Sequence, residues 1–290
     1  MKTQNQIVLL MYARAREDFQ DMRKRMDNRL GRKADGTKQA LKEERYFSLE
    51  DVENFNLIAS TARQNEKQVE QMLKDILNRF PIWTEWLSKV HGIGEVAGAW
   101  LIGSIDIHQA NTVSKIWQYA GLNPGMVCGK KRIPIKDYKE ADGEIIQIIK
   151  QDGKEKDYVV LTNTMIKGDR PSPGFILPYN KKLRTVLMGI IAQNFIKSKS
   201  PYTKYYYDYK NRLENAKKPV DSPGTRDDGK LWCEVSKGHR DMAAKRYMIK
   251  MFLKDLYIAW RTMEGLPVRP PYAEEYLGRH HSCQSIAVNL

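Results

Sequence analysis

The sequence predicts a mainly α-helical fold with a long N-terminal arm, a helix-hairpin-helix turn and a small β-hairpin insertion. Along several long segments, apolar residues recur at spacings of three and four, which is the period of an amphipathic helix. The pair Gly92 and Gly94 stands between two such stretches. At about 133–178 the composition changes to isoleucine and valine runs flanked by turn residues. We therefore expect an arm at 1–80, a helical domain at 81–266 interrupted by the insertion, and an extended tail at 267–290.

The arm is predicted to consist of two long helices that pack together like a coiled coil. In the first helix, seven residues form the expected seam: Val8, Tyr12, Ala15, Phe19, Met22, Met26 and Leu30. The second helix should begin at a capping box of Ser48 and Asp51 and end before Pro81. Its expected apolar stripe is Val52, Phe55, Ile58, Ala62, Val69, Met72, Leu73, Ile76 and Phe80. Two seams of this kind predict an antiparallel pair or a homo-oligomer interface, without catalytic chemistry.

The turn at residues 90–97 is predicted to reverse the chain between two helices in very few residues. Glycine takes positive φ without a steric penalty, and Ile93 between the two glycines should turn inward. The second helix then starts with N–H groups that lack intrahelical partners and suit a phosphate oxygen. Such a turn holds a nucleic-acid backbone without reading bases. The expected contacts are Lys89, His91, Gly92, Ile93 and Gly94. The alternative is an ordinary tight helix corner with no ligand.

The middle of the chain is predicted to contain a basic loop followed by the β-insertion. The loop is residues 128–132, with Lys130, Lys131 and Arg132 as candidate nucleic-acid contacts. Within the insertion, 145–149 and 158–161 are rich in β-forming residues and flank Asp152-Gly153, which is typical of a hairpin.

A helix should resume at Asn180, and its first turn supplies Asn180, Lys181, Lys182 and Arg184 as further candidate contacts. The aromatic segment at 202–210 could stack bases or fill a core, and we favour the core. The last helix, at about 238–261, should bury Met242, Ala243, Tyr247, Met248, Met251, Phe252, Leu256 and Trp260. Its other side is expected to be positive, through Arg240, Lys245, Arg246, Lys250 and Lys254, of which Lys245 and Arg246 are candidate contacts.

The composition indicates a polyanionic partner and a cytoplasmic location. The formal net charge is +14 and the isoelectric point about 9.5, and nucleic acid is the usual partner of so basic a protein. No apolar run approaches a membrane span, and the N-terminal residues do not resemble a signal peptide. Three cysteines, an odd number far apart, fit a reducing compartment. His280, His281 and Cys283 could bind a metal fortuitously, but a polar tail is favoured, and no metal is expected in cis.

Several motifs occur in the same order as in the C-terminal domain of the insertion-sequence-110 group of transposases, which this chain resembles over about residues 48–270. They are H-G-I-G at 91–94, I-D-I at 105–107, Y-A-G-L-N-P at 119–124, C-G at 128–129 and Y-N-K-K-L-R at 179–184. The segment R-D-M-A-A-K-R at 240–246 is similar to the family's final helix. The resemblance implies a helical, DNA-binding protein that acts in recombination or transposition.

The chain departs from the family pattern at two points. Family members carry an N-terminal domain whose four acidic residues bind magnesium, whereas the first half of this chain shows no aspartate-bearing strand. The family's nucleophilic serine is replaced by Cys128, beside cations that would favour a thiolate. We therefore expect a relative that binds duplex DNA and has lost autonomous strand transfer. Two alternatives stay open. One is a recombinase that uses Cys128, with Mg²⁺ bound by an acidic partner domain, and the other is a structured-RNA-binding protein.

Overall fold

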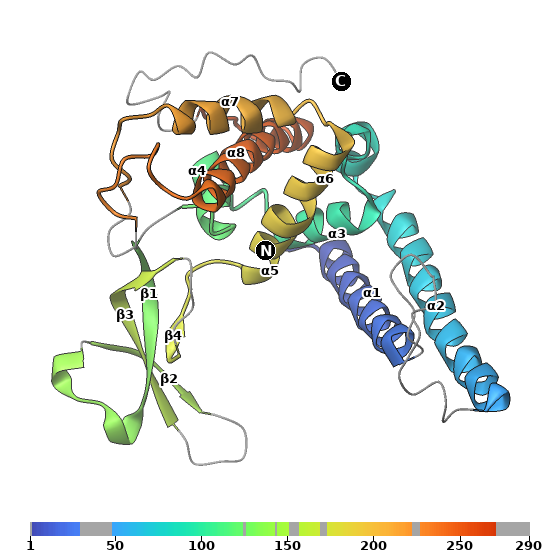
Figure 1. The fold of residues 1–290 in the computed structure, drawn as a ribbon. Helices are drawn as coiled ribbons and strands as arrows, with labels where there is room; N and C mark the ends of the chain where they lie inside the picture. The colour runs from blue at the N-terminus through green and yellow to red at the C-terminus, as the bar shows by residue number, and fades with distance from the viewer. Residues whose placement is uncertain are drawn as a thin grey trace. The chain divides into compact units, whose positions relative to one another are not determined.

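The computed structural model describes residues 2–29, 48–123, 126–142, 144–150, 157–168, 173–221 and 227–270. The chain divides into two compact units, Met1–Asp106 and Ile107–Leu290. The predicted class is confirmed, since both units are mainly helical and the second contains one small antiparallel sheet (Figure 1). The hairpin shares a unit with the arm, whereas the sequence grouped it with the C-terminal helices, because the helix after the turn packs on both arm helices.

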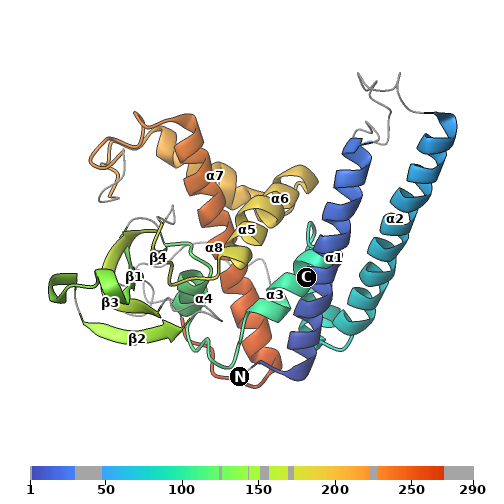
Figure 2. The same cartoon turned by 90° about the horizontal axis from the view of Figure 1, so that it is seen from below.

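The first unit is built on two long antiparallel helices, α1 (Gln4–Arg29) and α2 (Leu49–Leu77), which lie side by side (Figure 2). The predicted capping box is confirmed: the Ser48 hydroxyl accepts from the Asp51 N–H, and the Asp51 carboxylate accepts from the Ser48 N–H. After α2 come a π-helical turn, η1 (Ile82–Trp86), a 3-10 turn, η2 (Leu87–Lys89), and helix α3 (Glu95–Ser104).

The contact between α1 and α2 differs from the predicted seam. The buried side chains of α1 are Gln6, Leu9, Ala13 and Met26, so only Met26 of the predicted set is buried. Between Ala13 and Met26 of α1, the contact with α2 is made mainly by ion pairs. Arg16 lies 3.1 Å from a Glu66 oxygen, Arg23 lies 2.6 Å from the other, and Arg63 pairs with Asp27. Ile58 and Met72 of the predicted α2 stripe are exposed. The spacing of apolar residues predicted the wrong contact face because paired arginine and glutamate side chains occupy part of the interface between α1 and α2.

Two glycines allow α3 to approach its neighbours closely. A Cβ on Gly98 would overlap the Trp83 ring, and one on Gly103 would stand 2.7 Å from the Leu10 side chain. The Gln6 amide also donates to the carbonyls of Ile102 and Ile105, at 2.8 and 3.0 Å, and so satisfies the end of α3. The hairpin is therefore held against α1 by packing and by hydrogen bonds.

The second unit contains a four-stranded antiparallel sheet in the order β2-β3-β1-β4. The strands are β1 (Met126–Pro134), β2 (Ile145–Lys150), β3 (Asp157–Lys167) and β4 (Phe175–Ile176), and short 3-10 turns, η3 (Ile135–Asp137) and η4 (Glu140–Asp142), follow β1. The predicted hairpin corresponds to β2 and β3. The prediction of a loop at 128–132 is wrong, because this segment is the middle of β1, where pairing with β3 and β4 uses its backbone groups.

The helices of the second unit pack around an aromatic core. They are α4 (Val113–Tyr119), a continuous helix of α5 (Lys181–Thr185), the π-helical η5 (Val186–Ile191) and α6 (Ala192–Ser198), then α7 (Thr203–Glu214) and α8 (Lys237–Met263). Tyr202 stacks on Phe195 at 5.2 Å and meets Phe252 edge-on at 5.5 Å. Tyr205 and Tyr206 are also buried, so most of the aromatic segment packs in the core, as predicted, while Tyr207 is exposed.

Two predictions for α8 need correction. Met242 is exposed, and Arg240, expected on the positive side, is buried because its guanidinium donates to the carbonyls of Cys233 and Val235 at 3.0 and 2.6 Å. No helix among the described residues is long and apolar enough to cross a membrane. Leu30, the Asp152-Gly153 turn, and the tail from residue 271, with its two histidines and Cys283, lie outside the described residues.

Candidate nucleic-acid interface

The predicted hairpin geometry is present in the first unit. Gly92 has φ +99°, which favours glycine, and Ile93 is buried with its N–H bonded to the Val90 carbonyl at 3.0 Å. Gly94 is the N-cap of α3 and has extended backbone. Gly94 has no side chain that could cap this helix, and the first N–H groups of a helix have no intrahelical acceptor. Lys89 and His91 are exposed beside the turn.

The surroundings of this helix start are mixed in charge. A cavity of about 310 Å³ adjoins it, lined by Glu95 and Val96 of α3 and by Lys67, Glu70, Gln71, Leu73 and Lys74 of α2. Glu70 already pairs with Arg16 at 2.8 Å, which offsets its charge. Sequence reasoning missed Lys67 and Lys74, because only the packing of α2 on α3 brings them to the turn.

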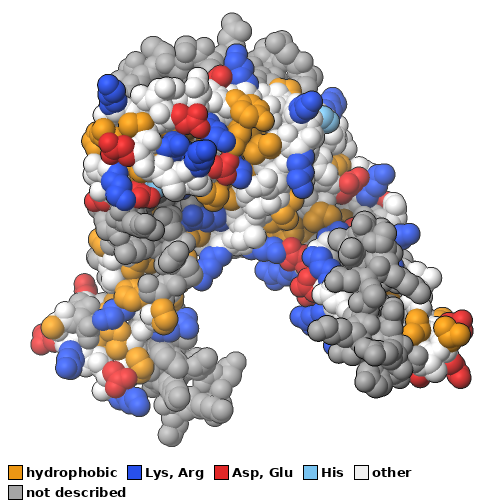
Figure 3. Space-filling model, viewed as in Figure 1, with side chains coloured by type: hydrophobic (Ala, Val, Ile, Leu, Met, Phe, Trp, Pro, Cys, Tyr) orange, Lys and Arg blue, Asp and Glu red, His pale blue; other side chains and the backbone are white. Residues whose placement is uncertain are grey.

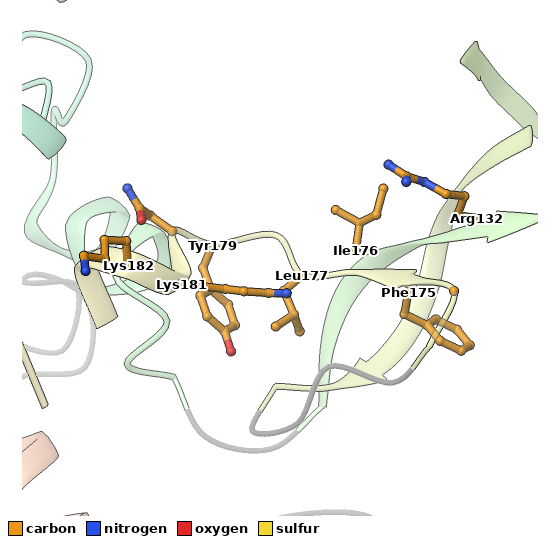
Figure 4. A pocket seen from close by; sticks show the side chains of 9 residues that line it. Arg132, Phe175, Ile176, Leu177, Tyr179, Lys181 and Lys182 are labelled. Atoms are coloured by element: carbon orange, nitrogen blue, oxygen red, sulfur yellow. The ribbon is translucent and has the colours of Figure 1, made fainter. Parts of the chain in front are cut away.

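A second cavity, of about 500 Å³, lies in the second unit where β4 leads into α5 (Figure 4). It is lined by Arg132, Gly174, Phe175, Ile176, Leu177, Tyr179, Asn180, Lys181 and Lys182. Figure 4 shows the Lys181 side chain extending toward Leu177, with Arg132 on the opposite, strand-bearing side. Four of the predicted residues therefore line one cavity, and its lining includes three cations and no carboxylate.

Asn180 and Arg184 hold the start of α5 in place. The Asn180 side-chain oxygen accepts from the Leu183 N–H at 3.0 Å, and its amide donates to the Tyr119 hydroxyl at 3.0 Å. Arg184 donates to the Gly168 carbonyl at 2.9 Å and to the Tyr179 hydroxyl at 3.1 Å. These bonds occupy both side chains within the chain, so they position Lys181 and Lys182 at the cavity.

Cys128 lies exposed on β1, opposite Met165 of β3, and forms no disulfide. Gly129 after it is required by packing, since a Cβ there would overlap the Ile166 side chain. Lys130 and Lys131 pair with Ile176 and Phe175 of β4, which places this basic strand beside the cavity. Among the described residues, no three histidine, cysteine or acidic side chains gather as metal ligands.

The basic side of α8 is partly neutralised. The Lys245 amine lies 2.6 Å from an Asp241 oxygen, and Asp241 also accepts from the Tyr206 hydroxyl at 2.5 Å. Burial, together with that hydrogen bond, raises the pKa of Tyr206. Figure 3 shows the same interleaving, with acidic and basic side chains mixed over α7 and α8.

Lys250, which the sequence suggested as part of the positive side of α8, is partly buried. Its amine stands 5.1 Å from the centre of the Trp117 ring and 3.3 Å from the Asn123 side-chain oxygen. Burial, with a smaller contribution from the Arg246 charge, lowers the pKa of Lys250 to about 8. Lys250 therefore packs against Trp117 and Asn123. Lys245, one of the two predicted contacts on α8, is paired with Asp241 of the same helix.

Comparison with known proteins gives no assignment: no protein-family model matches this chain, and no curated protein matches it. The resemblance to insertion-sequence-110 transposases stays a prediction from the motifs.

Proposed function

We propose that this protein binds the backbone of duplex DNA and acts in recombination or transposition, or in their control, as a relative of the insertion-sequence-110 transposases. The observation that carries the proposal is the cavity at the start of α5, lined by Arg132, Lys181 and Lys182 without a carboxylate. Cations arranged in a concave surface attract phosphate groups without reading bases. The formal net charge of +14 supports a polyanionic partner.

The hairpin is the second proposed contact. The start of α3 offers N–H groups at the positive end of the helix dipole. The adjoining cavity holds Lys67 and Lys74 together with the carboxylates of Glu70 and Glu95, of which Glu70 is paired with Arg16. A phosphate there would accept from the backbone, with Lys89 and His91 exposed nearby. The part played in transposition and the choice of DNA over RNA rest on the motif resemblance alone. Homo-oligomerisation through α1 and α2 is also proposed from the sequence.

The test is the salt dependence of duplex binding by the full chain, measured by fluorescence anisotropy. The logarithm of the binding constant should fall linearly with the logarithm of salt concentration, by about 0.9 per phosphate contacted. Changing both Lys181 and Lys182 to Glu should weaken binding about tenfold or more and make the slope shallower by about two units. Circular dichroism of the variant should match that of the wild type, since both lysines lie in the first turn of α5 and neither is buried.

The control is the pair Lys197→Glu and Lys204→Glu, which changes net charge equally at two lysines outside the cavity. Its affinity should stay within about threefold of the wild type. Equal losses in both variants would show that overall charge, and not the cavity, determines binding. A structured RNA that binds more tightly than duplex DNA at the same salt would replace DNA as the partner.

A further inference from the structure

The strand β2 presents an apolar edge to solvent. It is at the end of the sheet order, and the described residues pair it with β3 alone. Ile145, Ile146 and Ile148 are 41, 41 and 53% exposed. An edge strand leaves one row of backbone N–H and C=O groups unpaired, and proteins usually protect such an edge with charge or proline. The middle of β2 has no charge and no proline, and its one irregularity is the register shift with β3 between Ile145 and Gln147. An uncharged edge of this kind is typical of a strand that pairs with another chain.

The apolar residues of this edge are arranged symmetrically about its centre, and its two ends carry opposite charges. Residues 144–150 are E-I-I-Q-I-I-K, and Gln147 stands at the centre. When two copies run antiparallel about a two-fold axis at Gln147, Ile146 faces Ile148 of the other copy. In the same register, isoleucine faces isoleucine at 145 and 149, and the acidic residue 144 faces the basic residue 150. Opposite charges and β-branched pairs directly across an antiparallel pair stabilise it.

We propose that β2 is a self-association surface, where β2 of one copy pairs antiparallel with β2 of a second copy in this register. Because the interface uses the same residues on both copies, the pairing closes into a dimer and leaves no apolar β2 edge for a third. The inference does not depend on nucleic-acid binding.

Disulfide trapping tests the register. In the full chain with Cys128, Cys233 and Cys283 changed to Ser, Gln147→Cys places two cysteines opposite each other at the axis. Cα separations across an antiparallel pair, about 4.5–5.5 Å, lie within the range of a disulfide. Mild oxidation should therefore give a covalent dimer on a non-reducing gel.

The matched control is Ile145→Cys in the same background. In the proposed register residue 145 faces residue 149, so the two introduced thiols would start from Cα atoms about 13 Å apart along the strands, too far for a disulfide. Cross-linking at 147 and not at 145 supports the pairing. Equal cross-linking at both positions, or at neither, overturns it.

Charge exchange is the second test, read as the dimer dissociation constant by sedimentation. Glu144→Lys should weaken the dimer about tenfold, because two like-charged pairs then face each other, and Lys150→Glu should do the same. The double variant with both changes should restore the wild-type value. A chain that is monomeric throughout, or a dimer that none of these changes affects, would overturn the proposal; the unaffected dimer would place the interface elsewhere, for example on α1 and α2.

Discussion

At the scale of single residues, Gly94 can be substituted to test phosphate binding without changing the fold of the hairpin. Its backbone is extended and a Cβ there would meet no atom within 4 Å, so the fold does not require glycine. Gly92, Gly98 and Gly129 differ, since positive φ or close packing excludes a side chain at each. Gly94 therefore permits substitution at the proposed phosphate site without disturbing the hairpin.

Gly94→Asp should raise stability and lower DNA affinity. Aspartate caps a helix slightly better than glycine, by a few tenths of a kcal/mol, while its charge would repel a phosphate approaching the first turn of α3. Chemical denaturation and anisotropy measure the two effects on the same sample. Gly94→Asn is the control, because it caps similarly without the charge and should reduce affinity less. Unchanged affinity in Gly94→Asp would remove the α3 start from the interface.

At the scale of elements, the arm depends on Glu66, a buried carboxylate of α2 that faces Arg16 and Arg23 of α1. The hydrogen bond to Glu66 is the largest influence on the Arg23 guanidinium and raises its pKa. The contact between the two helices is therefore partly a network of charges, and the sequence period alone did not reveal it.

Glu66→Gln should lower the free energy of unfolding by about 2 kcal/mol, because it leaves two arginines against a neutral amide in a partly buried contact. Urea denaturation followed by circular dichroism measures the change. The control is Glu53→Gln, an exposed glutamate on the same helix, which should change stability by less than about 0.5 kcal/mol. A loss no larger than in this control would mean that the charges in the arm contribute little.

At the scale of the whole molecule, the chain has two compact units. Each unit contains a buried contact that one substitution can remove without touching the other unit. In the first, Gly98 lies against Trp83. In the second, the Arg261 guanidinium donates to the carbonyls of Ile107, Ala110 and Pro267 at 2.9, 3.0 and 2.7 Å. Units with separate cores are expected to unfold as separate cooperative transitions.

Gly98→Ala and Arg261→Met should each lower the midpoint temperature of a different unfolding transition in calorimetry. In Gly98→Ala the added methyl group would clash with the Trp83 ring, which should lower the free energy of unfolding by about 1–3 kcal/mol. Arg261→Met would remove the donor to three carbonyls and should lower the free energy of unfolding by a similar or larger amount. Each variant should leave the other transition in place. If both variants shift one common transition equally, the chain unfolds as a single unit.

Elements with local sequence signals could be predicted without the structure. The capping box at Ser48, the positive φ at Gly92, the helix start near Asn180 and the β2–β3 hairpin follow from the preferences of a few neighbouring residues. Cys128 to Arg132 had the composition of a loop, and only partner strands distant in sequence made it β1. Strand formation depends on such pairing more than on local preference.

Which charged side chains are exposed and which are bonded inside the protein became clear only from the packing of distant segments. Arg184 and Arg240 have the same formal charge as Lys181, yet the first two donate to carbonyls of the second unit, whereas Lys181 is exposed at its cavity. Composition counts charges, whereas the cost of desolvating a charge and the carbonyls, hydroxyls or rings that offset this cost depend on packing between distant segments.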